Sequence, residues 1–263
     1  MAQQNSLYTF VNKLGNVRGM KYKNLEPTFV GLLGGPTRDQ VLNDANFVRT
    51  RENMSEFGGS SHAARTYRIG VSPLKAFQMS YLSGFLNSKV IQICQLGAGA
   101  RGERAILFTV NQPIMEFTDL NQAQTFNSIS GVIYTMSSNV ARNQATLSLP
   151  SFIPSNLLNA PVGATHYQFI LNATAVSDYA FTAGIGYQPT NAVANGANFT
   201  AMGAIIALNV TSASASIVAP IGGAPAMTNA TMFTTIGIQF YQQVNAVFYL
   251  LAENNAAQID LLF

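Results

Sequence analysis

The chain has 263 residues, of which 48% are hydrophobic and 10% are charged, and its formal net charge is +3. This hydrophobic content excludes a disordered protein, and 21 glycines without a regular period exclude a collagen-like one. A single cysteine excludes a disulfide framework and a cysteine-based zinc site, and so small a net charge gives no nucleic-acid footprint. The composition is that of a globular protein.

The first 36 residues predict a small antiparallel meander. Residues 7–11, 17–23 and 28–33 are short runs of aromatic, β-branched and other apolar residues, separated by residues that favour turns. We call residues 1–36 the N-terminal arm.

Residues 37–100 predict a helical segment. Thr37 begins a helical run that extends to His62 and is interrupted near Gly58 and Gly59. Ser72 is placed to cap a second helix, with Pro73 at its first position and apolar residues recurring at helical spacing as far as Cys94. On this apolar stripe we expect Cys94 to be a buried small hydrophobe.

From residue 101 onward the hydrophobic period changes from 3.6 to 2. Residues 101–263 therefore predict an antiparallel β-sandwich of the jelly-roll or immunoglobulin-like kind, with residues 176–198 and 220–229 as long loops. The fold class is α+β, mainly β. The expected strands are 106–110, 132–136, 145–149, 167–173, 204–210, 214–219, 236–241, 247–251 and 258–262.

Charge is distributed unevenly along the chain. Residues 1–119 hold 13 basic and 8 acidic side chains, whereas residues 120–263 hold only Arg142, Asp178, Glu253 and Asp260. A near-neutral surface of amides, hydroxyls and small apolar groups allows copies to approach without desolvating ions. The alternative is a monomer with a neutral polar surface.

The sequence predicts neither a secretion signal nor a membrane-spanning helix. It begins without a basic region followed by an apolar one, and polar residues and Pro220 interrupt the charge-free stretch 201–221. We expect a cytoplasmic protein with no membrane partner, although export by a non-Sec route or release by cell lysis stays compatible with the sequence.

No motif predicts catalysis, a cofactor or a metal. The GxGxxG at residues 97–102 follows a helix and precedes a strand, so we interpret it as a helix stop rather than a dinucleotide loop. His62 and His166 lie on different elements without acidic neighbours at ligand spacing. Ser60 or Ser61, His62 and Asp178 could be written as a hydrolase triad, but no nucleophile elbow supports it.

Charged residues at spacings of three and four predict ion pairs on the first helix, within one chain or between copies. The solvated face of a single copy is the simpler interpretation, and contacts between copies are the alternative. On the sandwich we expect the neutral surface to carry such contacts. The candidate contact residues are Arg49, Arg51, Glu52, Glu56, Arg65, Thr200 and Thr211.

Four blocks, 47–58, 101–104, 160–167 and 238–247, resemble in the same order a widespread family of uncharacterised Bacteroidota proteins. The resemblance implies an N-terminal β-meander, a helical segment and a C-terminal β-rich region, with no known activity. Ala246 departs from it, because relatives tend to have Gly after the Asn. Alanine at positive φ costs about 1 kcal/mol, so we expect a turn other than type I′ there.

We expect a non-enzymatic structural protein that needs no small-molecule substrate and whose partner is itself. The predicted product is a homopolymer, a filament or tube, formed through the charge-poor sandwich surface and the N-terminal arm. Two alternatives stay open: a virion or tail-like structural protein of a prophage, and a carbohydrate-binding β-sandwich module. The second needs exposed aromatic residues on one face, and its clustered candidates are Tyr179, Phe181, Tyr187 and Phe199.

Overall fold

The computed structural model describes residues 2–3, 10–22, 25–32 and 34–263. The chain divides into two compact units, Met1–Arg51 and Glu52–Phe263, and each is described by itself. The fold is α+β and mainly β, as the sequence predicts.

The first unit contains a four-stranded antiparallel sheet. Its strands lie in the order β1 (Ala2–Gln3), β4 (Leu25–Leu32), β3 (Val17–Tyr22) and β2 (Asn12–Leu14). The predicted meander is therefore present. Of the run expected at residues 7–11, residues 7–9 lie outside the described residues, and the strand that precedes β3 begins at Asn12.

Two short helices follow the sheet, α1 (Arg38–Asn43) and the 3-10 helix η1 (Ala45–Phe47). Thr37 caps α1, because its hydroxyl accepts a hydrogen bond from the Gln40 amide while the Gln40 side chain accepts one from the Thr37 amide. Neither helix contains a buried residue.

Helix α2 (Val48–Gly70) is unbroken, so the expected interruption at Gly58 and Gly59 is wrong. Gly59 is required by close packing, because a Cβ there would lie 2.3 Å from Cγ of Tyr187. Gly58 has open space beside it. One glycine is thus a contact residue of a continuous helix, and neither ends it.

The second long helix, α3 (Leu82–Leu96), begins ten residues later than Ser72. Residues Ser72–Phe77 form the 3-10 helix η2, whose N-cap is Val71, and Gln78 is extended, so the predicted Ser72 cap is wrong. The predicted stop is confirmed: α3 ends at Leu96 and Gly97 caps it. A Cβ on Gly97 would collide with the Ala105 carbonyl oxygen, which explains the glycine.

The second unit contains a seven-stranded and a three-stranded antiparallel sheet. The central sheet has the order β11 (Asn198–Met202), β8 (His166–Ser177), β14 (Ala230–Val244), β16 (Ala256–Leu262) and β5 (Thr118–Asp119). Two more strands extend it, β12 (Ile206–Ala207) beside β8 and β15 (Val247–Leu250) beside β14. The other sheet has the order β13 (Ala215–Pro220), β7 (Gln144–Leu149) and β6 (Thr135–Ser138).

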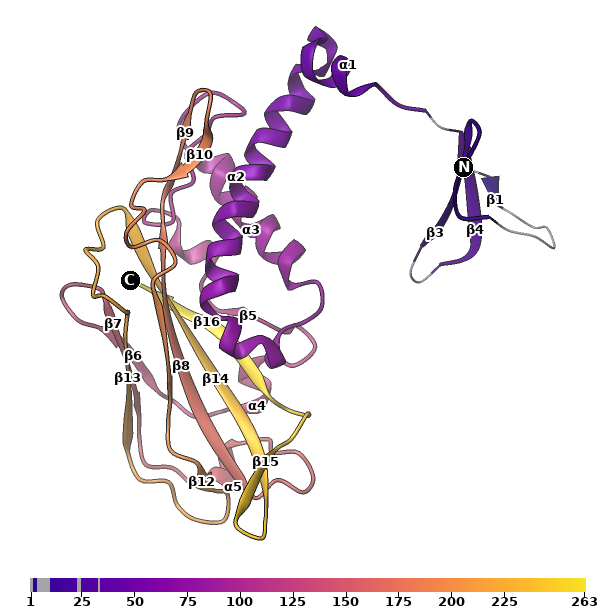
Figure 1. Ribbon diagram of the computed structural model, residues 1–263. Helices are drawn as coiled ribbons and strands as arrows, with labels where there is room; N and C mark the ends of the chain where they lie inside the picture. The colour runs from indigo at the N-terminus through magenta and orange to yellow at the C-terminus, as the bar shows by residue number, and fades with distance from the viewer. Residues whose placement is uncertain (1, 4–9, 23–24, 33) are drawn as a thin grey trace. The chain divides into compact units, whose positions relative to one another are not determined.

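These elements form three layers, with α2 and α3 on one face of the central sheet and the β13-β7-β6 sheet on the other (Figure 1). Strand β8 is buried on both faces: Tyr167, Phe169 and Leu171 pack toward the second sheet, and Ile170 and Val176 pack toward the helices. A two-sided strand explains why its sequence is apolar over most of its length. The predicted sandwich is present, with a layer of helices added to it.

The structure differs from the predicted strands in four places. Of the run 132–136, only Thr135 and Met136 are strand, because β6 begins at Thr135. Only Ile106 of the run 106–110 pairs, in an isolated bridge to Tyr179. The run 204–210 shortens to β12, and the expected loop 176–198 contains a hairpin of β9 (Tyr179–Thr182) and β10 (Gly186–Pro189). The remaining short helices are η3 (Gln112–Ile114), α4 (Phe126–Ile129) and α5 (Pro154–Leu157).

Candidate functional site

The best-formed polar cluster of the second unit centres on the buried carboxylate of Glu56 on α2. Arg104 donates from Nε to Oε1 at 2.8 Å and from Nη2 to Oε2 at 2.7 Å, and the Gly102 amide also donates to Oε1 at 2.8 Å. The hydrogen bonds from Arg104 hold the pKa of Glu56 below its usual value. This cluster fastens the loop after α3 to α2, so the Glu56 side chain is occupied inside the chain.

Other candidate contact residues are also engaged within their own unit. Arg51 donates from Nη1 to the carbonyl oxygens of Val41 and Asp44, each at 2.9 Å, and so binds the C-terminal end of α1. Glu52 lies 3.8 Å from Arg101 in a half-exposed ion pair. Arg49 is exposed.

Arg65 and His62 lie at a groove between α2 and the β9–β10 hairpin. Two adjoining depressions of about 290 and 250 Å³ make up this groove, and both are lined by His62, Tyr187 and Gln188. At its polar end the Tyr179 hydroxyl is 2.9 Å from Thr66 Oγ1 and accepts a hydrogen bond from Asn195. Among the described residues, no carboxylate lines either depression. The groove therefore offers the Arg65 guanidinium, the His62 imidazole and hydroxyls, with no carboxylate beside His62.

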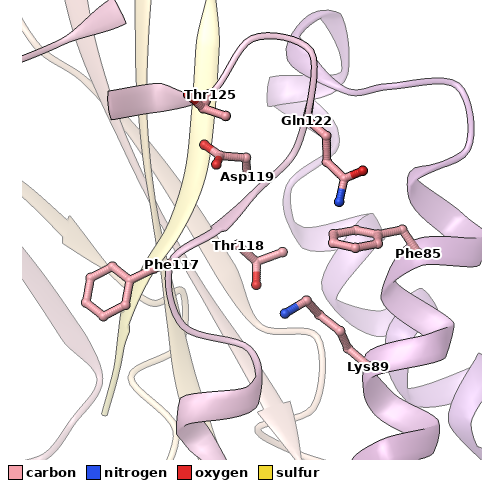
Figure 2. Close-up of a pocket in the computed structure, with 7 residues that line it drawn as sticks. All are labelled: Phe85, Lys89, Phe117, Thr118, Asp119, Gln122 and Thr125. Carbon is pink, nitrogen blue, oxygen red and sulfur yellow. The ribbon is translucent and has the colours of Figure 1, made fainter. Parts of the chain in front are cut away.

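A separate pocket of about 340 Å³ lies between α3 and the loop that carries β5 (Figure 2). Lys89 donates from Nζ to the Ile114 carbonyl oxygen at 2.8 Å and lies 5.6 Å from the centre of the Phe85 ring. Asp119 lies at the other end of the pocket and accepts a hydrogen bond from the Phe126 amide at 2.7 Å.

Burial shifts both ionisable groups of this pocket toward their neutral forms. It lowers the pKa of Lys89 and raises the pKa of Asp119. Shifts of this kind occur at functional sites and also in structural networks. Here the Lys89 ammonium and the Asp119 carboxylate each form a hydrogen bond with the backbone, and among the described residues neither forms one with a hydroxyl or a thiol.

The sequence candidates for catalysis are not brought together. Asp178 is buried, and its two carboxylate oxygens accept from the amide and hydroxyl of Thr109 at 3.1 and 2.6 Å. His166 is hydrogen-bonded to Thr165 and packs edge-to-face against Phe248, whereas His62 lies in the groove. Cys94 is fully buried, as predicted, and burial raises the pKa of its thiol. Within the described part of the chain, no three His, Cys, Asp or Glu side chains are grouped to hold a metal ion.

The two threonines predicted on the sandwich surface differ. Thr211 is exposed, whereas Thr200 is half-buried on β11 and accepts a hydrogen bond from the buried Asn172 side chain at 2.8 Å. Three of the four clustered aromatic residues, Tyr179, Phe181 and Tyr187, pack in the core under α2. Only Phe199 is exposed, so these residues form no open aromatic platform.

Sequence reasoning missed the most exposed apolar element of the second unit, the tip of the β14–β15 hairpin. All four residues of β15, Val247–Leu250, are exposed, with 40–56% of each accessible to solvent. Asn245 and Ala246 form its turn with φ of 48° and 64°. Both values are positive, as in a type I′ turn, so the expectation of a different turn is wrong.

No family model, curated protein or solved structure matches this chain. In the part of the chain that the structure describes, no helix is both long enough and apolar enough to cross a membrane.

Proposed function

We propose that this protein is a non-enzymatic structural protein that assembles with copies of itself into a polymer. In this assembly the N-terminal arm and the charge-poor surface of the sandwich supply the contacts between copies. One observation carries the proposal: the first unit has a folded sheet, and the side chains described in it form no hydrophobic core.

Where the structure describes the side chains of Met1–Arg51, only Gly19 and Thr28 are buried. Large apolar side chains of this unit are exposed instead, namely Val11, Leu14, Leu32 and Leu42. A small sheet is stable in water only when a hydrophobic face is covered. The sheet β1–β4 therefore needs a partner surface, and a second copy supplies one at the same concentration as the sheet itself.

The second unit supports the same proposal in a different way. It has two cores of its own, yet residues 179–252 carry no charged side chain. Charged surfaces keep soluble proteins apart. The surface that residues 179–252 form has no charged side chain of its own. A contact that is repeated without closing extends into a filament, whereas a closed one gives a ring.

The test is deletion of the arm, residues 1–36, with mass measured by light scattering and shape by negative-stain electron microscopy. We expect the full chain to form regular particles or filaments and the deleted chain to stay folded but to form no polymer. A full chain of 28.2 kDa at high concentration would contradict the proposal. An assembly that survives the deletion would remove the arm from it.

A further inference from the structure

We infer that the outer edge of strand β15 pairs with β15 of a second copy, joining two central sheets in a continuous antiparallel sheet. This inference rests on the proposed self-assembly and names one of its contacts.

Strand β15 lies at an edge of the central sheet. It pairs on one side with β14, in the register Tyr241 opposite Leu250 and Val244 opposite Val247. On its other side no strand among the described residues pairs with it. An edge strand of this kind presents a row of unpaired amide and carbonyl groups, which is a template for another strand.

The edge of β15 carries no charge, proline or bulge. Monomeric proteins use these three features, and short strand length, to protect edge strands. The sequence of β15 is Val-Phe-Tyr-Leu, its four pairs with β14 run without a register shift, and its turn is Asn245–Ala246. Apolar side chains are also exposed on both faces of the strand, where a bound partner would cover them.

A second copy of this chain fits the uncharged edge of β15. Residues 179–252 carry no charge, so an acidic or basic partner finds no complementary charge on this hairpin. A second copy is equally uncharged, and an antiparallel pair of identical edges matches every donor with an acceptor. The contact is therefore isologous, with the same residues on both copies.

Antiparallel geometry restricts the register. Residues opposite each other in an antiparallel sheet share a face, and alternate residues of β15 lie on opposite faces. A two-fold pairing therefore places Phe248 opposite Phe248 of the second copy, or Tyr249 opposite Tyr249. Each arrangement brings two identical Cα atoms to about 4.5–5.5 Å, which is within the range that a disulfide spans.

The first experiment is cross-linking. Phe248→Cys and Tyr249→Cys are oxidised separately and run on a non-reducing gel, with Val140→Cys as the matched control. Val140 is fully exposed at the β6–β7 turn, and the native Cys94 is buried. We expect a covalent dimer from at least one β15 variant and none from Val140→Cys. Equal cross-linking at all three positions, or none at either β15 position, would overturn the inference.

The second experiment separates this inference from the proposed function. Tyr249→Lys brings like charges together across the pairing, and we expect self-association at least about tenfold weaker, whereas Val140→Lys leaves it unchanged. Sedimentation velocity measures both variants beside the wild type. If the wild type assembles and Tyr249→Lys assembles equally well, the β15 contact is wrong and the proposed function stands.

If the wild type is monomeric, the inference and the proposed function both fail. In that case flotation with neutral phosphatidylcholine vesicles asks whether the apolar hairpin binds lipid instead. If the wild-type monomer floats with the vesicles and Tyr249→Lys does not, the hairpin binds a lipid surface and the pairing is wrong.

Discussion

The two units of this chain place their apolar residues differently. In Glu52–Phe263 they fill two cores on the two faces of the central sheet, and the first of these residues along the chain is Ala63. In Met1–Arg51, Val11, Leu14 and Leu32 are exposed on or beside a sheet that has no core among its described side chains. The second unit therefore has the core that it needs to fold by itself, whereas the proposed function assigns the exposed apolar residues of the first unit to a contact with a second copy.

The largest expected effect on the stability of the second unit comes from Glu56→Gln. Arg104 is partly exposed, and its two charge-assisted hydrogen bonds weaken when Glu56 loses its charge. We expect a loss of about 2–3 kcal/mol of unfolding free energy at pH 7. Urea denaturation of both proteins measures it. An unchanged midpoint would mean that the cluster at the loop after α3 does not stabilise this unit.

The same variant gives a pH test. The hydrogen bonds from Arg104 hold the folded-state pKa of Glu56 below its ordinary value of 4.5, so its stabilisation is present above that value and is lost as pH falls through the folded pKa. The difference in stability between wild type and Glu56→Gln should therefore shrink on acidification below about pH 4.5. A difference that stayed constant to pH 3 would contradict the assignment.

The next effect compares two adjacent glycines on α2. Gly59→Ala places a methyl group against the Tyr187 ring, and we expect a net loss of about 2 kcal/mol. Gly58→Ala has open space, so its helix propensity should add about 1 kcal/mol. Thermal unfolding of Gly59→Ala and Gly58→Ala measures both changes. Equal shifts of their midpoint temperatures would contradict the packing of α2 on the β9–β10 hairpin.

A smaller effect is expected at the turn of the β14–β15 hairpin. Ala246 has φ of 64°, where glycine carries no steric penalty, so Ala246→Gly should stabilise the protein by about 0.5–1 kcal/mol. Chemical denaturation measures this change. A destabilised variant would show that the alanine contributes a contact that outweighs the backbone strain.

The smallest effect on stability is expected from Thr211→Lys on the neutral sandwich surface. Thr211 is exposed, so unfolding free energy should stay within about 0.5 kcal/mol of wild type. Assembly should weaken if this surface contacts a neighbour, which light scattering detects. Thr200→Lys is a poorer probe because Thr200 accepts a hydrogen bond from Asn172.

Local patterns predicted much of the fold. The period-2 runs at 145–149, 214–219 and 247–251 correspond to β7, β13 and β15, and Thr37 marks the start of α1. These features depend on neighbouring residues in the chain. The stop at Gly97 could be predicted for the same reason.

What the sequence could not predict depends on contacts between distant residues. The sequence predicts a helix break at Gly59, whereas in the structure Tyr187, 128 positions later, packs against this glycine within a continuous helix. The sequence places Glu56 on a solvated face, whereas in the structure Arg104 and Gly102 bind its buried carboxylate. The β15 edge was missed because alternation predicts a strand without telling whether both of its sides are paired.

The most direct test of the central claim is amide hydrogen exchange at two protein concentrations, one monomeric and one assembled by light scattering. We predict that β8 and β14 are protected at both concentrations, whereas β3 and β4 become protected only in the assembly. Equal protection of β3 and β4 in the monomer would mean that the first unit is stable alone, and it would contradict the account.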